Sequence, residues 1–377
     1  MPKNLLILTC DSGGGHRSVS DALVGALEQS FPGEYRFHLR DIMADCFAFP
    51  LSAAGRAYGP VVNRFPRAWG LLWHCTNGRR RSPLLLRLVS PLAYGRLARV
   101  VRETQPEIVV STHPWSNHLP AWLLKQMETT VPLVTVVTDP VSIHHWWLCP
   151  EVDLCLVPTE QARQRAVAAG MPTERVRVIG LPVCLEFHQR PVDKKEAKKK
   201  LGLASDRSTI LVLGGGDGMG DVFPSARAAA RAAPGSQLVV VAGRNQGLKR
   251  RLEAVTWEVP TTVVGFANNM GDLMHAADLL ITKAGPSTIS EALACGLPML
   301  ISGALRGQEE GNVEWVLKTG AAMLTTTPDQ VGSALRSLLR DGHQTLSEMG
   351  HKARQAAKPL AALLAAQVID QVASQSR

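Results

Sequence analysis

Residues 283–312 read KAGPSTISEALACGLPMLISGALRGQEEGN, and they form the most specific stretch of the chain. An apolar run at 278–282 leads into this stretch, and a second apolar run, MLIS at 299–302, lies within it. Gly285 and Pro286 follow the first run, and proline suits the first turn of a helix. The stretch therefore predicts a strand, a helix and a second strand, which is the repeating unit of a parallel sheet covered by helices.

The same alternation extends through the rest of the chain in both directions. Two runs, EIVVST and LVTVVT, are apolar on both faces, as strands buried inside a parallel sheet require. These two runs predict strands at 107–112 and 133–138. Further strands are predicted at 5–9, 35–39, 153–158, 209–213, 237–241 and 261–264, and helices are predicted at 18–29 and 160–170. We therefore expect an α/β fold made of two doubly wound Rossmann-like domains.

The predicted domain boundaries follow from length and composition. A chain of 377 residues is too long for one ordinary core, and it fits two domains of roughly 150 to 200 residues. The composition becomes polar and charged around DKKEAKKK, which we interpret as a solvated helix face on a linker. We predict an N-terminal domain at 1–185, a linker at 186–208, a second domain at 209–355 and a C-terminal helix at 356–377, whose docking surface stays open.

Composition excludes several classes of protein. No apolar run reaches the roughly 18 residues that a membrane-spanning helix needs. The first residues enter a strand-like segment without the features of a secretory signal peptide, so none is expected. The seven cysteines are scattered without a CxxC pair, which argues against a zinc site and against a disulfide framework. We expect a cytoplasmic protein with reduced thiols.

Three stretches suit a ligand that carries phosphate. CDSGGGHRSVS at 10–20 and GGGDGMGD at 214–221 each follow a predicted strand, where glycines either let N–H groups approach an anion or form a tight turn. GGGDGMGD does not match the GxxxxGK[ST] phosphate loop and no lysine follows it, which argues against an ATPase or kinase. At 285–288 a helix start capped by Ser287 or Thr288 would stabilise a diphosphate.

Carboxylate and amide side chains follow that helix start. Glu291 lies about one turn into the helix. Its carboxylate either accepts hydrogen bonds from two ribose hydroxyls or only adds a favourable negative charge near the helix N-terminus. The run GQEEGN at 307–312 supplies adjacent donors and acceptors for sugar hydroxyls, and it also suits a solvated polar loop.

Seven stretches occur in the order of one known family and cover nearly the whole chain. They are SGGGHR at 12–17, THPWSNHLP at 112–120, VVTDPVSIHHWW at 136–147, GGGDGMGD at 214–221, GFANNM at 265–270, ITKAGPSTISEAL at 281–293 and GQEEGNV at 307–313. On these stretches the chain closely resembles the monogalactosyldiacylglycerol synthases and the related diacylglycerol glucosyltransferases, which are glycosyltransferases of the GT-B fold. The resemblance implies two domains facing a central cleft, and a UDP-sugar as donor.

The resemblance also implies roles for residues of the second domain. The diphosphate would be held by the glycine loop and the helix start, namely Gly214, Gly215, Gly216, Gly218, Met219, Gly220, Gly285, Pro286, Ser287 and Thr288. Gly265 and Phe266 would meet the uracil, and Glu291 the ribose. Gln308 and Glu309 would bind the hexose hydroxyls. Plant members usually read GPGT where this chain has GPST, so Ser287 adds a hydroxyl near the phosphates.

Two residues of the first domain are candidate catalysts. His16 lies in the first turn of a helix, where the positive dipole disfavours its protonation and keeps it neutral, as a general base must be. Its alternative role is to cap or line the turn. Asp139 ends LVTVVT, near the acceptor in the family pattern, although an aspartate before proline is also a common turn starter. We expect Asp139 to be the base with His16 assisting, while Gly14 and Gly15 let sugar and acceptor come close.

The basic charge is concentrated in one segment. The net charge is +9, and residues 51–102 contain ten arginines and no lysine, aspartate or glutamate. Trp and Leu residues interleave with these arginines, which favours reversible binding to anionic lipids at a membrane surface. The candidate contacts are Trp69, Trp73, Arg79, Arg80 and Arg81. The alternatives are a solvated face over a core-facing stripe, or a site for single-stranded nucleic acid, against which no RNP, KH or zinc pattern is visible. Trp146 and Trp147 either touch lipid or pack in the core.

The resemblance implies a single displacement in which the hydroxyl of 1,2-diacylglycerol attacks an α-linked UDP-hexose and yields a β-glycolipid with inversion. Galactose is favoured over glucose, because GPST and GQEEGNV read closer to the galactolipid synthases. No suitably placed DxD-type motif exists, so we expect no essential metal and no other cofactor. We expect UDP-galactose or UDP-glucose, diacylglycerol and anionic lipids as partners, no nucleic acid, and a peripheral location on the inner face of the cell membrane. The alternatives are another lipid-linked acceptor, or a non-catalytic protein that binds a nucleotide or an anionic polymer.

Overall fold

The computed structural model describes residues 2–188, 193–340 and 344–375, which form two compact units. The first unit comprises Met1–Leu185, Arg306–Gln308 and Leu360–Arg377, and the second comprises Glu186–Leu305 and Glu309–Pro359. Residues 189–192 of the predicted linker, and 376–377 of the predicted C-terminal helix, lie outside the described residues. Each unit holds a six-stranded parallel sheet packed with helices, which confirms the predicted α/β class.

The sheet of the first unit has the strand order β2-β1-β3-β4-β5-β6. Its strands are β1 (Lys3–Thr9), β2 (Tyr35–Asp41), β3 (Ile108–Ser111), β4 (Leu133–Val136), β5 (Leu154–Val157) and β6 (Val176–Val178). Strands β3, β4 and β5 are buried along their whole length, as the apolar runs predicted. The order reverses between β1 and β3, and open α/β sheets bind ligands outside the carboxyl ends of the strands at such a switch point.

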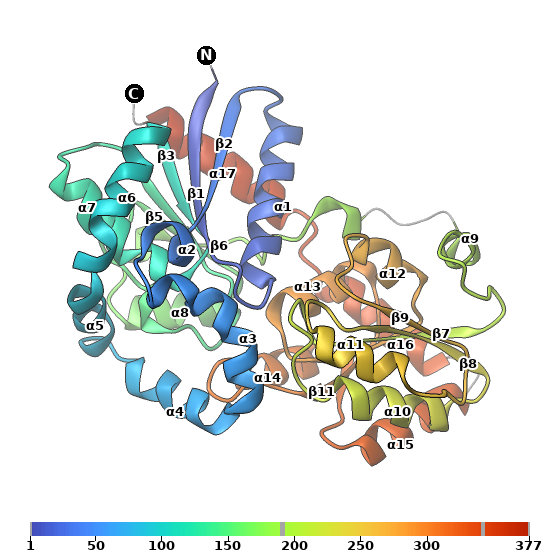
Figure 1. Ribbon diagram of the computed structural model, residues 1–377. Helices are drawn as coiled ribbons and strands as arrows, with labels where there is room; N and C mark the ends of the chain where they lie inside the picture. Colours follow the sequence, from blue (N-terminus) through green and yellow to red (C-terminus); the bar gives the residue numbers. More distant parts are fainter. Residues whose placement is uncertain (1, 189–192, 341–343, 376–377) are drawn as a thin grey trace. The chain divides into compact units, whose positions relative to one another are not determined.

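Helices cover both faces of this sheet. They are α1 (Gly15–Ser30), α2 (Ile42–Cys46), α3 (Ala54–Arg64), α4 (Pro66–Thr76), α5 (Arg81–Val89), α6 (Pro91–Thr104), α7 (His118–Gln126), α8 (Glu160–Ala168) and α17 (Ala361–Gln375). Apolar residues of α1 and α17 pack on one face, and those of α2, α6, α7 and α8 pack on the other. Figure 1 shows α17, in red, lying beside α1 along the sheet. The C-terminal helix therefore docks on the first unit, a surface that the sequence left open.

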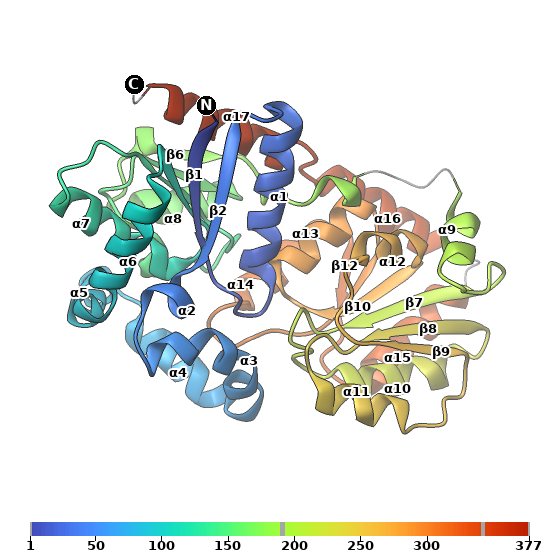
Figure 2. The ribbon, with the colours of Figure 1, turned by 45° about the horizontal axis from the view of Figure 1, so that its top comes forward.

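The sheet of the second unit has the order β12-β11-β10-β7-β8-β9. Its strands are β7 (Ser208–Leu213), β8 (Ser236–Val241), β9 (Thr261–Val264), β10 (Leu279–Lys283), β11 (Met299–Gly303) and β12 (Ala322–Leu324). Its helices are α9 (Lys194–Lys200), α10 (Val222–Ala232), α11 (Gln246–Glu253), α12 (Met270–Ala276), α13 (Pro286–Cys295), α14 (Glu310–Lys318), α15 (Pro328–Arg340) and α16 (Gln344–Ala356). Figure 2 shows β7, β8 and β9 side by side, with α10 and α11 along one face. Here the strand order reverses between β7 and β10.

Two short strands escaped the sequence-based prediction. Strands β6 and β12 are three residues long, and each has only its first residue buried, so neither shows an apolar run. Helix α1 begins at Gly15, earlier than the predicted 18, because Gly14 adopts a left-handed conformation (φ 87°) that turns the chain directly into the helix.

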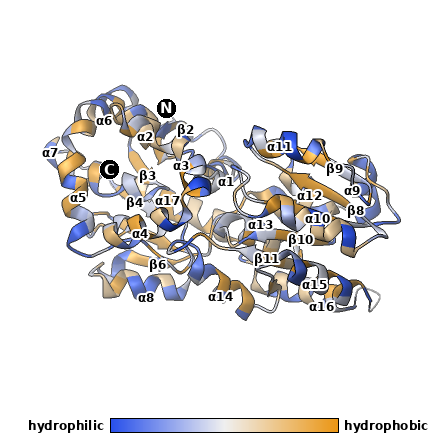
Figure 3. Cartoon of the chain, turned by 60° about the horizontal axis from the view of Figure 1, so that its bottom comes forward, coloured by the Kyte–Doolittle hydropathy of each residue, from blue (hydrophilic) through white to orange (hydrophobic). Residues whose placement is uncertain are grey.

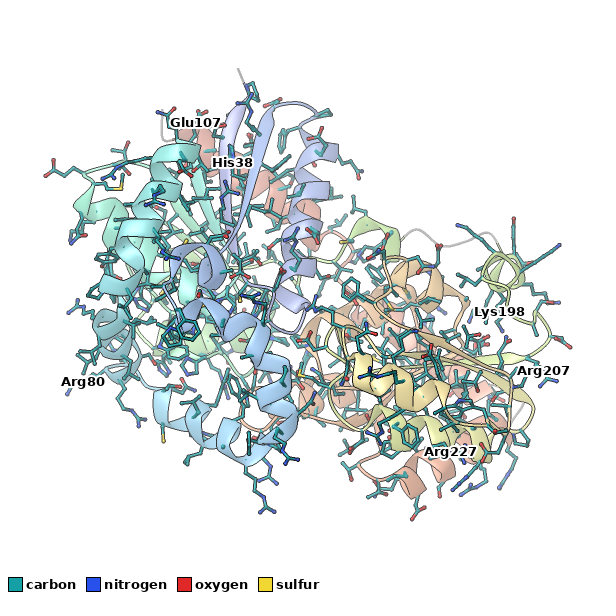
Figure 4. The ribbon with its side chains drawn as sticks, viewed as in Figure 1. His38, Arg80, Glu107, Lys198, Arg207 and Arg227 are labelled. Atoms are coloured by element: carbon teal, nitrogen blue, oxygen red, sulfur yellow. The ribbon has the colours of Figure 1, made fainter. Side chains whose placement is uncertain are left out.

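The lysine-rich helix α9 is exposed at five of its seven residues, as its prediction as a solvated face requires, but Lys198 is an exception. Lys198 is buried, and its Nζ donates to Asp278 Oδ2 at 2.7 Å and to the carbonyl oxygen of Arg207 at 2.8 Å. Lys194 donates to the same carboxylate at 2.9 Å. Figure 4 labels Lys198 and Arg207 on this side of the second unit. Part of the charge run therefore attaches α9 to the rest of the second unit, because Asp278 accepts hydrogen bonds from two of its lysines.

The predictions drawn from apolar runs and cysteines can also be compared with the structure. Within residues 2–188, 193–340 and 344–375, no helix has the length and apolar character to cross a membrane. All seven cysteines are free thiols, so the expectation of no disulfide framework agrees with the structure.

Candidate functional site

The switch point of the first unit brings three predicted or neighbouring polar residues together. His16 lies in the first turn of α1, as predicted, and Thr112 and His113 follow β3. His16 Nδ1 lies 2.9 Å from the carbonyl oxygen of Thr112 and 3.0 Å from the hydroxyl of Thr138, the second residue after β4. The imidazole rings of His16 and His113 meet edge to face, with centroids 4.6 Å apart.

These contacts determine which nitrogen of His16 carries the proton. A carbonyl oxygen only accepts hydrogen bonds, so Nδ1 bears the hydrogen and donates it to Thr112. Nε2 then carries a lone pair, which is the form that accepts a proton. Burial lowers the pKa of His16 to about 4, against a smaller opposing effect of the bond to Thr112. The ring is neutral at neutral pH and is configured as a proton acceptor.

Asp139 is held by a buried tryptophan. Trp147 Nε1 donates to Asp139 Oδ2 at 2.7 Å, and both side chains are buried. The same indole lies beside His16, with ring centroids 5.9 Å apart. The structure thus gathers both predicted catalysts around one indole. Of the two alternatives for Trp147, core packing is the one observed, because its side chain is 0% exposed and cannot touch a bilayer.

His113 is a candidate that the sequence reasoning missed. Its Nδ1 accepts the N–H of Trp115 at 3.4 Å, so its proton lies on Nε2. Burial, with a smaller contribution from His16, holds the pKa of His113 well below its usual range. The two rings therefore offer one acceptor nitrogen and one N–H donor. The signal that was available is a histidine two residues after β3, a strand that the sequence predicts as buried.

In the second unit, the glycine loop 214–220 follows β7 and folds back on itself. The N–H of Met219 donates to the carbonyl of Gly214 at 2.8 Å. A Cβ on Gly214 would lie 2.1 Å from the carbonyl oxygen of Met219, and one on Gly218 would lie 2.2 Å from that of Ala242. Both positions therefore require glycine. Met219, predicted to contact the diphosphate, has a buried side chain, and its N–H takes part in the turn.

The N-terminus of α13 follows β10, the strand beside β7 in the sheet. Its N-cap is Gly285, and Pro286 is its first residue, so the prediction that Ser287 or Thr288 caps the helix is wrong. A helix start without a side-chain cap presents N–H groups and a positive dipole to an anion. Glu291 lies three residues beyond Thr288 on the same helix face, and both side chains are buried.

Lys283, the last residue of β10, is a second residue that the sequence reasoning missed. Its ammonium group lies 3.1 Å from the position of a Cβ on Gly285, close to the start of α13. It forms a buried ion pair with Glu309, whose other oxygen accepts the N–H of Leu305 at 3.0 Å. Glu309 is 3% exposed, so its carboxylate serves the loop and Lys283. The binding of hexose hydroxyls by Glu309 stays a prediction.

Gln308 is the other residue predicted to bind hexose hydroxyls. It belongs to the first unit, where Tyr58 of α3 donates its hydroxyl hydrogen to Gln308 Oε1 at 3.0 Å. The neighbouring Gly307 (φ 77°) lies against Trp73 of α4, whose ring is 2.6 Å from the position of a Cβ at 307. Gln308 and Glu309 are adjacent in sequence, yet they are held by different units, which the run GQEEGN did not reveal.

Phe266, after Gly265 at the end of β9, is 53% exposed. The guanidinium of Arg244 stacks above Phe266 at 5.2 Å, and its Nε donates to Asp217 Oδ1 of the glycine loop at 2.9 Å. The backbone N–H of Arg244 also donates to Gly216 at 2.8 Å. Arg244 thus connects the predicted uracil and diphosphate contacts, a link that no motif indicated.

An apolar and basic surface covers α3 to α5 of the first unit. Of the fifteen large hydrophobic residues exposed in the described part of the chain, nine lie between 49 and 92, namely Phe49, Val61, Phe65, Leu71, Leu72, Leu84, Leu85, Leu88 and Leu92. Figure 3 shows hydrophobic and hydrophilic residues side by side on α4 and α5. A solvated basic face over a core-facing stripe would hide these side chains, so that alternative is wrong.

The predicted membrane contacts occupy different depths of this surface. Arg80 and Arg81 are exposed, and Figure 4 shows Arg80 at the outer edge near α5. Trp69 and Trp73 are half-buried, the first against Tyr58 with ring centroids 5.1 Å apart. The exposed Arg79 lies over Gly170, and Trp146 donates through Nε1 to the carbonyl of Ser82 at 3.1 Å. These tryptophans support the helices, and the leucines form the outermost layer.

Two family models match the chain. The model described as monogalactosyldiacylglycerol synthase matches residues 16–183, and the glycosyltransferase family 28 C-terminal domain matches residues 209–365. Monogalactosyldiacylglycerol synthase 2 of Arabidopsis thaliana is 33% identical over 382 residues, which cover 99% of this chain and 81% of that protein. A probable monogalactosyldiacylglycerol synthase 2 of Oryza sativa subsp. japonica is 36% identical over 335 residues, covering 86% and 71%. Both are chloroplastic proteins.

Solved structures show the same fold at lower identity. MurG of Acinetobacter baumannii aligns with a TM-score of 0.59 and 16% identity, covering 98% of this chain and 100% of that one. Anabaena HepE in complex with UDP-glucose aligns with a TM-score of 0.58 and 14% identity, covering 98% and 99%. Together with the two six-stranded parallel sheets, these likenesses confirm the predicted GT-B fold.

Proposed function

Because the chain belongs to the monogalactosyldiacylglycerol synthase family, we propose that it transfers a hexose from a UDP-sugar to the free hydroxyl of 1,2-diacylglycerol. Galactose is the proposed hexose, and the names of the relatives support this choice over glucose. The observation that carries the proposal is the group formed by His16, Asp139 and Trp147, which follow the carboxyl ends of β1 and β4. A protein that only binds a nucleotide has no use for a neutral imidazole and an oriented carboxylate in one place.

The first unit supplies the proton acceptor in this reaction. The acceptor hydroxyl attacks the anomeric carbon, its proton passes to the base, and the bond from that carbon to UDP breaks, with inversion from an α-linked donor to a β-glycolipid. Asp139 takes the proton, and His16 assists through Nε2. Burial disfavours the imidazolium form of His16 and lowers its pKa to about 4, so in this scheme His16 stays neutral and assists by accepting a hydrogen bond.

The second unit holds the leaving group. The first turn of α13 and the glycine loop, at the ends of β10 and β7, stabilise the charge that develops on the diphosphate. Lys283 lies close to Gly285 and adds a positive charge there. Phe266 and Arg244 form the wall for the uracil, and Glu291, on the same helix face as Thr288, holds the ribose. No essential metal is needed in this scheme, since N–H groups and Lys283 supply the positive potential.

The surface of α3 to α5 is the proposed membrane-binding surface, which holds the enzyme at the bilayer that contains its lipid substrate. Diacylglycerol stays in the bilayer, so the protein binds peripherally to the membrane, on its inner face. Insertion of exposed leucines such as Leu88, which is 70% exposed, supplies apolar burial. The arginines of the same segment add roughly 1 kcal/mol each near an anionic leaflet.

Product analysis tests this proposal. The purified protein is incubated with vesicles of anionic lipid and diacylglycerol, separately with UDP-galactose and UDP-glucose, and the lipids are separated. A galactolipid with a β-linkage is expected. His16→Ala and Asp139→Asn should each abolish most of the product, whereas His351→Ala and Asp329→Asn, at exposed positions of the second unit, should not.

Three outcomes would revise the proposal. Product from UDP-glucose alone would change the sugar. Folded, vesicle-bound protein that makes no glycolipid from either donor would exclude diacylglycerol as the acceptor. Full activity of Asp139→Asn with loss in His16→Ala would move the base from the carboxylate to the imidazole.

A further inference from the structure

Three potential metal ligands meet in the first unit, outside the group around His16. His118 begins α7, and Cys149 and Glu151 lie in the loop that follows β4. Their ligand atoms, an imidazole nitrogen, a thiol sulfur and a carboxylate oxygen, all lie within 4.8 Å of one another. Cys149 Sγ already donates to Glu151 Oε2 at 3.1 Å. The three side chains therefore point at one common position.

His118 supplies an independent sign of a missing ligand. Its side chain is 3% exposed, and its Nε2 is buried without a hydrogen-bond partner among the described residues. An unsatisfied buried polar atom costs about 1–3 kcal/mol, so such atoms are rare unless something binds them. Backbone carbonyls of His145 and Leu148 also interact with the ring. A carbonyl oxygen can only accept hydrogen bonds, so it favours a proton on the ring nitrogen that faces it and a lone pair on the other nitrogen, the arrangement of metal-bound histidines.

We propose that His118, Cys149 and Glu151 bind a divalent ion of the Zn²⁺ type. Imidazole, thiolate and carboxylate are the three side-chain ligands that zinc uses, and a thiolate selects Zn²⁺ over Mg²⁺ or Ca²⁺. The ion displaces the thiol proton of Cys149, which then passes to solvent. Glu151 is exposed, so the fourth position is open to water. The scattered cysteines argued against zinc, because His118 and Cys149 meet only in the folded chain.

The site lies between two loops that carry the proposed catalytic group. Trp147, two residues before Cys149, holds Asp139. Asn117, directly before His118, donates to the carbonyls of His113 at 3.1 Å and Trp146 at 3.3 Å. A bound ion would therefore tie the loop after β3 to the loop after β4. Binding of the ion does not depend on the identity of donor or acceptor, so it is tested without the transfer reaction.

Cobalt titration tests the site directly. The full-length protein is treated with chelator and titrated with Co²⁺, whose absorption spectrum gains a charge-transfer band when a thiolate coordinates it. One equivalent of Co²⁺ with this band is expected, and Zn²⁺ should displace it. Cys149→Ser should lose the band. Cys75→Ser, which removes an exposed thiol, is the matched control and should keep it.

A second variant covers the case in which Cys149→Ser fails to fold. Glu151 is exposed, so Glu151→Gln preserves the fold, and it should weaken Co²⁺ binding by at least the roughly 10–100-fold that outer-sphere changes cost. Zn²⁺ should also raise the Tm of the native chain more than that of Glu151→Gln. Absence of the band in the native chain, its persistence in Cys149→Ser, or equal Co²⁺ affinity of Glu151→Gln would each overturn the proposal.

Discussion

Replacing Lys283 by methionine should lower the unfolding free energy of the second unit by about 3 kcal/mol. The substitution removes one partner of an ion pair in which the Lys283 and Glu309 side chains are 10% and 4% exposed. Breaking a buried pair on one side costs roughly 3–5 kcal/mol, because a charge is left without compensation. The N–H of Leu305 still donates to Glu309, which places the expected cost at the lower end of that range.

Urea unfolding of the variant, followed by circular dichroism, measures this cost. Lys318→Met is the matched control, because Lys318 pairs with Glu314 at 2.6 Å but both side chains are exposed, at 62% and 72%. Solvent screens exposed pairs, so the control should change the unfolding midpoint very little. The double variant Lys283→Met with Glu309→Gln should recover much of the loss, since it removes the orphaned charge.

The same variants separate stability from ligand binding. Lys283 lies near the start of α13, so both the single and the double variant should bind UDP more weakly than the native chain. A single variant as stable as Lys318→Met would refute the reasoning, because it would show that the pair between Lys283 and Glu309 is not desolvated in solution.

Four further outcomes are expected. Gly218→Ala should abolish UDP binding measured by calorimetry, because its Cβ would lie 2.2 Å from a carbonyl oxygen, whereas Gly235→Ala, with nothing within 4 Å, should bind UDP normally. Trp147→Phe should cost about 1–3 kcal/mol of unfolding free energy in urea, since Asp139 loses a buried donor; an unchanged midpoint would contradict this bond. Burial lowers the pKa of His16 to about 4 and of His144 to about 3, so the unfolded chain binds more protons, and stability should fall as pH drops from about 6.5 towards 4. His16→Asn should make that decline shallower in urea titrations across this range. Leu84→Ser with Leu88→Ser should weaken vesicle flotation by at least about tenfold, since burying one leucine is worth roughly 1.5–3 kcal/mol, while Leu324→Ser in the second unit should leave flotation unchanged.

Local features of the fold were readable from the sequence because they depend on near neighbours along the chain. Apolar runs such as LVTVVT predicted buried parallel strands, and all the predicted strands are present. Glycines after β1 and β7 predicted tight turns, since positive φ angles and close backbone approaches exclude side chains. Pro286 marked the first residue of α13, because its fixed φ suits that position. The family could be recognised from the order of such local motifs.

Contacts between distant residues were decided by strand order and helix packing alone. The bond between His16 and Thr112 joins residues 96 positions apart, and it exists because β1 and β3 are neighbours in the sheet. Lys283 pairs with Glu309, and His118 lies close to Cys149, because the fold likewise brings their segments side by side. Gln308 and Glu309 show the converse, since adjacent residues are held by different units. Sequence patterns record the steric preferences of single residues and turns, whereas the partner of a buried polar group depends on which elements the fold brings side by side.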